Sequence, residues 1–99
     1  MSSLNDFIVS RTFNTEAMTL NGGAVDTSPR ELAYTIPSGY KVLTYGTNCT
    51  WSASTQNGNF TVTQCYLDTQ NSKIKFRLGN VNNSAASDVV FITILFIRN

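Results

Sequence analysis

The last segment of the chain, DVVFITILFIRN, constrains its fold more than any other. Between Val89 and Ile97, Thr93 is the one residue that is not hydrophobic. A β-strand turns alternate side chains to opposite faces, so a strand at a solvated sheet surface normally alternates apolar and polar residues. Both faces of this strand are apolar instead, and both therefore need a cover.

The two faces of this strand need covers of different kinds. A chain of 99 residues can build one hydrophobic core, so we expect a single domain over residues 1–99. The even positions suit the interior of a sandwich: Val90, Ile92, Ile94 and Phe96. The odd positions would then lack a third layer: Val89, Phe91, Thr93, Leu95 and Ile97. A neighbouring subunit would cover this second face, and the alternative is a closed barrel or a loop folded over it.

The rest of the chain also has the pattern of β-structure. Short runs rich in β-branched and aromatic residues recur at 7–13, 31–36, 40–47, 59–67 and 73–78. Turn signals such as Gly22-Gly23 and Pro37-Ser38-Gly39 separate them. This pattern predicts an all-β fold, an antiparallel β-sandwich of the jelly-roll type.

The run at residues 59–67 contains a break in its alternation. Phe60 and Val62 share one face, whereas Cys65 and Leu67 have the opposite parity. One extra residue near Gln64 would return all four side chains to one face, so we predict a β-bulge there. The alternative is a strand that is covered on both faces.

Composition excludes several classes of function. The chain has no histidine, which removes the serine–histidine and cysteine–histidine nucleophile schemes. Cys49 and Cys65 alone cannot complete a zinc site, so we expect no metal and no cofactor. The net charge of +1 and the lack of a long apolar segment predict neither nucleic-acid binding nor membrane insertion. The carboxylates show no paired spacing for glycoside hydrolysis, and we expect no enzyme.

Aromatic residues among neutral polar residues are the candidate ligand site. The residues that we single out are Trp51, Tyr45, Asn57 and Tyr66. Sugar recognition often stacks a pyranose on an aromatic ring and binds its hydroxyl groups with amides and hydroxyls. The alternative is that these aromatic residues are half-buried parts of the core.

A second candidate site is a stripe of cations in KIKFRL. Lys73, Lys75 and Arg77 alternate with apolar residues and should therefore share one strand face. Such a stripe could bind a phosphorylated surface polymer. The alternative is an ordinary solvated face, on which lysine also protects an edge strand from aggregation.

The chain resembles a family through two motifs and its last strand. The first motif is PSGYK, from Pro37 to Lys41, which turns into a strand. The second is Asn80 followed by Ser84-Ala85-Ala86, which lies between the run at 74–78 and the apolar strand at 89–97. In these features about two-thirds of the chain resembles the C-terminal receptor-binding head domains of bacteriophage tail-fibre and base-plate proteins.

The resemblance implies a homotrimeric antiparallel sandwich on the virion surface, which is assembled in the host cytoplasm and binds a host cell-surface saccharide. Such heads usually end longer fibre proteins, whereas this chain begins with Met1, so it is either an excised domain or a free-standing component. The alternative function is a structural virion component, a capsid decoration or tail assembly protein, which contacts other virion proteins and has no ligand site.

The two cysteines lie equally far from Asn57 along the chain. A hairpin that turns at Asn57-Gly58 would bring Cys49 and Cys65 nearly opposite each other, so a disulfide is conceivable. Assembly in a reducing cytosol, which the resemblance implies, favours two free thiols.

Overall fold

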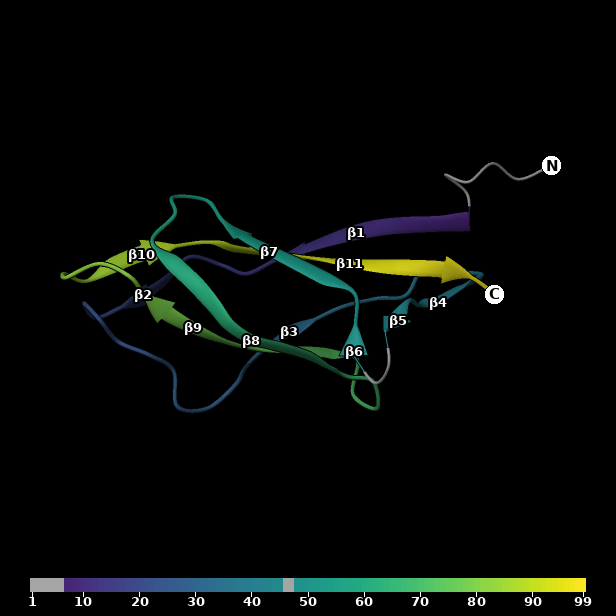
Figure 1. Ribbon diagram of the computed structural model, residues 1–99, viewed down its shortest axis with the longest axis horizontal. Coiled ribbons are helices and arrows are strands. Elements are labelled where there is room, and N and C mark those ends of the chain that lie inside the picture. The colour runs from purple at the N-terminus through teal and green to yellow at the C-terminus, as the bar shows by residue number, and fades with distance from the viewer. Residues whose placement is uncertain (1–6, 46–47) are drawn as a thin grey trace.

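A computed structural model of the protein describes residues 7–45 and 48–99, without the side chain of Tyr45. In this part of the chain the elements are all strands, and every pair of strands is antiparallel. The predicted all-β antiparallel fold is therefore confirmed. Figure 1 shows β1, β7 and β11 in an upper layer, and β3, β8 and β9 in a lower one.

The upper layer is built around the last strand, and we call it the β11 sheet. β11 (Val90–Arg98) pairs along one edge with β1 (Ile8–Asn14). Its other edge is shared by β7 (Trp51–Thr55), which pairs with its first half, and by β4 (Tyr40–Val42), which pairs with its end.

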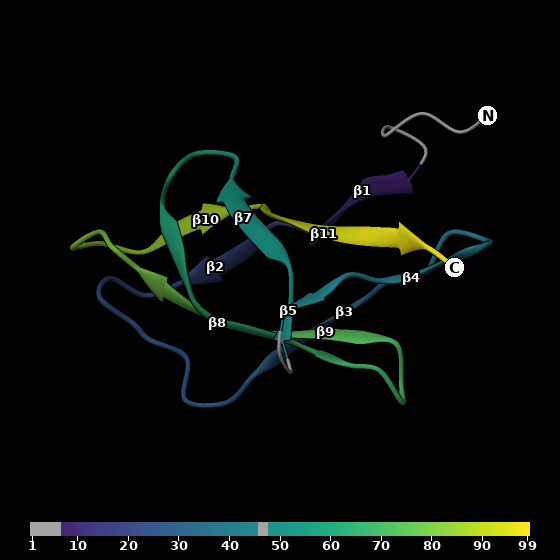
Figure 2. The same cartoon turned by 45° about the vertical axis from the view of Figure 1, so that its right-hand side comes forward.

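The lower layer, the β9 sheet, has β9 (Lys73–Asn80) in its centre. β3 (Arg30–Ala33) lies on one side of β9, and β8 (Phe60–Asp68) lies on the other. Two small ribbons complete the fold: β2 (Met18–Leu20) with β10 (Ala86–Asp88), and β5 (Thr44–Tyr45) with β6 (Asn48–Cys49). Figure 2 shows that the two large sheets face each other across the molecule.

The core lies between the inner faces of the two central strands. The even positions of β11 are fully buried, as their alternation predicts: Val90, Ile92, Ile94 and Phe96. Ile74, Phe76 and Leu78 of β9 meet them from the other side and are at most 1% exposed. At about 25 cal/mol per Å² of apolar surface, each fully buried side chain of this kind contributes about 1.5–3 kcal/mol to folding.

The predicted bulge in β8 is confirmed. Val62 lies opposite Leu78 and Gln64 lies opposite Arg77, so Thr63 is the extra residue. On either side of the bulge Phe60, Val62, Cys65 and Leu67 face the buried positions of β9. The bulge therefore keeps one long strand packed on the core across a break in its sequence alternation.

The turn at Asn57-Gly58 joins two layers instead of two strands of a hairpin. β7 pairs with β11, and β8 pairs with β9, so the conceivable hairpin that would set Cys49 opposite Cys65 does not form. Gly58 has a φ of 72°, which a glycine adopts without strain. The chain thus turns a corner of the sandwich at these residues.

A buried carboxylate holds this corner. Asp88, at 2% exposure, accepts hydrogen bonds from the backbone N–H groups of Asn57 (2.9 Å), Asn59 (2.9 Å) and Val89 (2.8 Å). Burial by itself would raise its pKa, but these donors stabilise the charged form and the pKa is lowered. Asp88 therefore joins the turn between the layers to the start of β11.

A buried amide organises the neighbouring loops. The Nδ2 of Asn80 donates to the carbonyl groups of Leu20, Asn21 and Ser84, each at 3.1 Å. Its Oδ1 accepts from the backbone N–H of Asn82 at 2.9 Å. The spacing of Asn80 and Ser84 in the sequence motif thus has a structural reason, since the amide closes the loop between β9 and β10.

We expect Asp88→Asn to destabilise the fold by about 1–3 kcal/mol, because an amide cannot accept from all three backbone donors and one of them would lose its partner. Urea unfolding would measure the free energy. Asp68→Asn is the matched control, since the hydrogen bonds of Asp68 go to Gln70 and Asn71 in its own turn. Equal effects of the two substitutions would contradict this role for Asp88.

Acid should destabilise the protein through Asp26 and Asp88. Burial would raise the pKa of Asp26, but hydrogen bonds from Arg30 and from the N–H of Leu78 outweigh it and lower the pKa. A lowered pKa in the folded state contributes stability above the ordinary value of 3.8, and this contribution is lost as the pH falls further. Urea unfolding between neutral pH and about pH 2 should show this loss, and it should be smaller in Asp88→Asn.

Candidate functional site

A hollow of about 520 Å³ opens between β4, the β5–β6 ribbon and β8, and we call it the β8 cavity. It thus lies between an outer strand of the β11 sheet, β4, and an outer strand of the β9 sheet, β8. Its lining residues are Val42, Thr44, Asn48, Cys49, Gln64, Cys65, Tyr66, Leu67 and Thr69.

The floor and the rim of the β8 cavity differ in polarity. Four partly buried residues that pack against the core form the floor: Val42, Cys49, Cys65 and Leu67. Five exposed residues with hydroxyl or amide groups form the rim: Thr44, Asn48, Gln64, Tyr66 and Thr69. None of the lining side chains is charged. The cavity therefore suits a neutral ligand that has both hydrogen-bonding groups and an apolar part.

The bulge in β8 creates this arrangement. Because Thr63 is the extra residue, Cys65 and Leu67 turn inward to the floor while Gln64 stays exposed at the rim. A regular strand would reverse the two parities after Val62. Bulges commonly re-aim side chains next to binding sites, and this one does so beside the β8 cavity.

Both cysteines are free thiols in the floor of the cavity. Burial raises the pKa of Cys49. Burial, with a smaller effect of Cys49, raises the pKa of Cys65 to about 12. Because the thiolate is the nucleophile and the metal ligand, the two residues act at neutral pH as small apolar groups.

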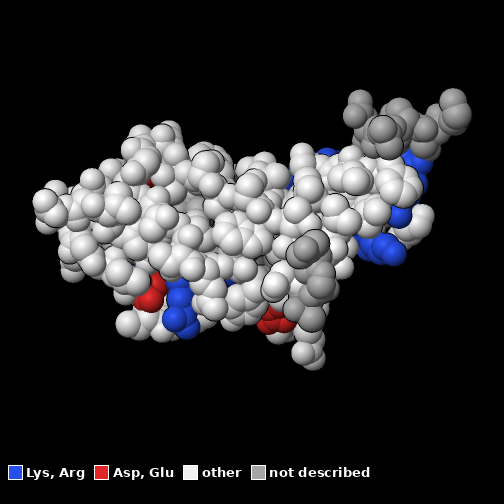
Figure 3. Space-filling model, in the orientation of Figure 1, with Lys and Arg blue, Asp and Glu red and all other residues white. Residues whose placement is uncertain are grey.

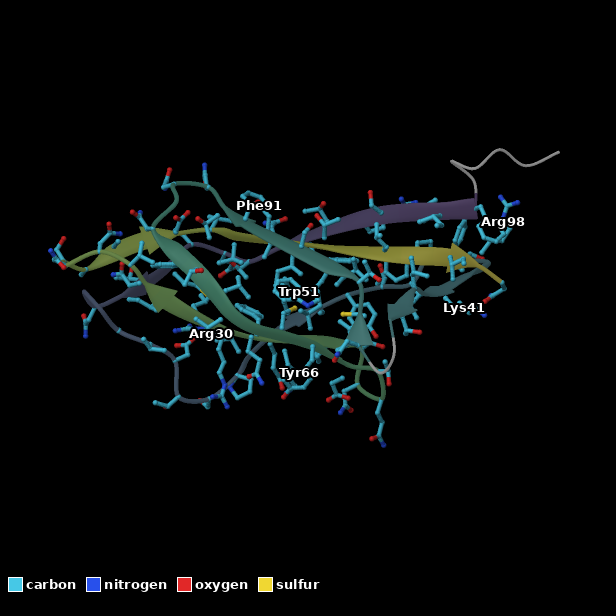
Figure 4. All side chains as sticks on the ribbon, viewed as in Figure 1. Arg30, Lys41, Trp51, Tyr66, Phe91 and Arg98 are labelled. Atoms are coloured by element: carbon cyan, nitrogen blue, oxygen red, sulfur yellow. The ribbon has the colours of Figure 1, made fainter. Side chains whose placement is uncertain are left out.

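The predicted aromatic site is dispersed in the structure. Tyr66 lies opposite Lys75, on the same face of β8 as Gln64, and it lines the β8 cavity at its rim. Trp51, at 38% exposure, belongs to β7 and lines a separate hollow of about 160 Å³ with Ala53 and Phe60. Figure 4 shows Trp51 between the layers and Tyr66 on the lower side of the molecule.

The other two predicted residues do not complete a site with Trp51. Asn57 lies in the corner between the layers, six residues after Trp51, which corresponds to about 20 Å along a strand. The side chain of Tyr45 lies outside the described residues. The structure thus does not gather Trp51 and Asn57, and it places Tyr66 at the border of another cavity.

The predicted cation stripe exists on the outer face of β9, but acidic groups accompany it. Lys75 forms an ion pair with Glu31 of β3. Lys73 lies opposite Asp68 of β8, and the charge of Arg77 helps to lower the pKa of Asp26. Figure 3 shows acidic and basic groups side by side along the lower edge of the molecule. This mixture of charges is typical of a solvated face and favours that interpretation.

The residues that sequence reasoning missed are the rim groups Thr44, Asn48 and Thr69. They lie in short polar runs that have no pattern of their own, and they meet only because the β5–β6 ribbon folds against β8. The one local signal was the break in alternation at Gln64.

Comparison of the chain with protein-family models, with curated proteins and with solved structures found no match. In the described part of the chain, no helix is long and apolar enough to span a membrane, and no cluster of three potential metal ligands occurs.

We expect both thiols to be alkylated without reductant, but slowly while the protein is folded, since burial keeps them protonated. Cys65 should react more slowly than Cys49. Mass spectrometry of the alkylated protein, with and without denaturant, would measure both rates. Thiols that stay unlabelled in denaturant until reductant is added would instead reveal a disulfide.

Proposed function

We propose that this protein is a binding module for a neutral saccharide, and that the β8 cavity holds the ligand. The observation that carries the proposal is the pairing of an uncharged amide and hydroxyl rim with an apolar floor. Amide and hydroxyl groups both donate and accept hydrogen bonds, which matches the hydroxyl groups of a sugar. The floor offers an apolar surface for ring C–H groups or for a methyl group of the sugar.

The setting of this function follows from the sequence resemblance. A phage adhesion head would present the cavity on the virion surface to a host cell-surface saccharide. The lack of charge in the cavity supports a neutral sugar over a phosphorylated polymer, for which a site rich in arginine or lysine would be expected.

A structural role in a virion is the second candidate function. It is supported by a different observation, the outer face of the β11 sheet, which has Lys41 as its one charged residue and could pack against other virion proteins. A structural component of this kind would need no ligand in the β8 cavity. Ligand binding therefore separates the two functions.

Gln64→Ala should weaken saccharide binding about fivefold, because one hydrogen bond to the ligand contributes about 1 kcal/mol. A glycan array would first identify a ligand, and titration calorimetry would then compare the variants. Gln56→Ala is the matched control, since Gln56 lies in the corner between the layers and away from the cavity. It should bind like the wild type.

Two further variants test the sites that the sequence predicted. If Trp51→Ala weakens binding and Gln64→Ala does not, the ligand binds at the β7 edge. If Lys73→Ala alone weakens binding, the ligand binds on the outer face of β9 and is anionic. No binding to any glycan would remove the saccharide proposal and favour the structural role.

A further inference from the structure

The outer face of the β11 sheet carries an apolar ridge that no described strand covers. Phe91, Leu95 and Ile97 of β11 are only partly buried, whereas the alternate residues of the same strand are completely buried. Beside Phe91, Thr93 and Leu95 the flanking residues have short or polar side chains: Ser10, Thr12 and Asn14 of β1, and Ser52 and Ser54 of β7. These side chains cannot shield the larger apolar groups between them. Beside Ile97 lie Lys41 and the exposed Ile8, which extends the apolar surface.

The polar centre of the ridge is partly paired. The hydroxyl of Thr93 shares a hydrogen bond of 2.8 Å with the hydroxyl of Thr12 on the neighbouring strand. One of the two hydroxyls donates in this bond, and the other keeps its own O–H donor. Drying the ridge therefore costs less than drying a face on which both hydroxyls are unpaired.

Charge distinguishes the two outer faces of the sandwich. The outer face of the β9 sheet carries Lys73, Lys75 and Arg77 with Glu31 and Asp68. The register of the β11 sheet places one charged residue on its outer face, Lys41, which lies opposite Ile97. A partner for this face must itself be apolar and nearly uncharged, and the face of a second copy of the chain meets both requirements.

The order of residues along β11 determines how two copies fit. Apolar residues flank Thr93 symmetrically, with Phe91 on one side and Leu95 on the other. If two faces pack with their β11 strands antiparallel about Thr93, Phe91 of each copy lies over Leu95 of the other. A hollow of about 150 Å³ lies beside Leu95, lined by Thr50, Trp51, Ser52, Thr93 and Leu95, and it can receive the phenyl ring.

The position of Lys41 favours the same orientation. Figure 4 shows Phe91 and Lys41 towards opposite ends of the β11 sheet. An antiparallel pair about Thr93 keeps the two Lys41 side chains at opposite ends of the interface. Lys41 lies opposite Ile97, four positions after Thr93, so it comes over Val89 of the partner copy and beside Gln56, whose N–H bonds to the carbonyl of Val89. A parallel arrangement, including one around a three-fold axis, would bring the Lys41 side chains to the same end, where they repel each other.

We propose that two copies of this chain pair through the outer faces of their β11 sheets, with a two-fold axis near Thr93. β11 is nine residues long, so the face measures about 30 Å along the strands and about 15 Å across three strands. The pair would then bury about 900 Å² in total, which is just below the roughly 1,000 Å² of a specific interface. The pair is therefore weak, and it dissociates on dilution.

Sedimentation equilibrium over a dilution series tests the pair. The wild type should change from a dimer to a monomer, and Leu95→Asp should weaken the pair at least about 100-fold, because it buries an unpaired carboxylate. Tyr66→Asp is the matched control, since Tyr66 is 39% exposed on the opposite outer face, and it should leave the pair unchanged. A wild type that stays monomeric at high concentration, or that has the mass of a trimer, would overturn the proposal.

The orientation has its own test. Gln56→Glu should tighten an antiparallel pair by about two- to fivefold for each of its two ion pairs with Lys41 of the partner copy. Gln56→Lys should weaken it, and Gln56→Glu combined with Lys41→Glu should lose the gain. If Gln56→Glu and Gln56→Lys weaken the pair equally, the antiparallel orientation is wrong.

A folding control accompanies both tests. Circular dichroism and urea unfolding should show that Leu95→Asp keeps the wild-type fold, whereas Ile94→Asp, in the core, should yield little folded protein. If Leu95→Asp does not fold, Phe91→Ser replaces it, because it removes the ring from the hollow without adding a charge. Phe91→Ser should then weaken the pair about tenfold or more, and a folded Phe91→Ser that pairs like the wild type would overturn the proposal.

Discussion

The contact between the inner faces of β11 and β9 is the interaction on which the rest of the structure depends. Ile92, Ile94 and Phe96 have no exposed surface, and they pack in the same core as Ile74 and Phe76. The strands on either side of β11 and β9 complete these two layers. Because so small a domain has one core, a charge at any of these positions should unfold the whole chain.

Buried polar groups determine how the layers are joined. Asp88 binds the turn between β7 and β8, and Asn80 binds the end of β2 with the loop that follows it and the loop that leads to β10. Each group is nearly or fully paired, so its burial costs little while it defines one path for the chain. The apolar core alone would allow many loop arrangements, and these two side chains select among them.

The sequence predicted those features that depend on strand alternation. It predicted the buried face of β11 and the charged outer face of β9, because both follow from the alternation of residue types along a strand. It predicted the bulge beside Gln64 because the alternation is interrupted there. It did not predict the β8 cavity, because Asn48 and Gln64 meet only through the packing of β6 against β8. The hairpin that was conceivable at Asn57-Gly58 does not form, for a related reason: a turn signal reports that the chain reverses, but not whether the next strand enters the same sheet.

The β8 cavity and the apolar ridge lie on different parts of the sandwich, so binding and pairing need not compete. The cavity opens beside β8, whereas the ridge follows the outer face of β11. An antiparallel pair would leave the β8 cavities of both copies open, so one dimer would carry two binding sites. For a ligand with repeated units, such as a surface polysaccharide, two linked sites raise the apparent affinity well above that of one site. Under the proposed function, an uncharged cavity with weak affinity for a single sugar would then be sufficient.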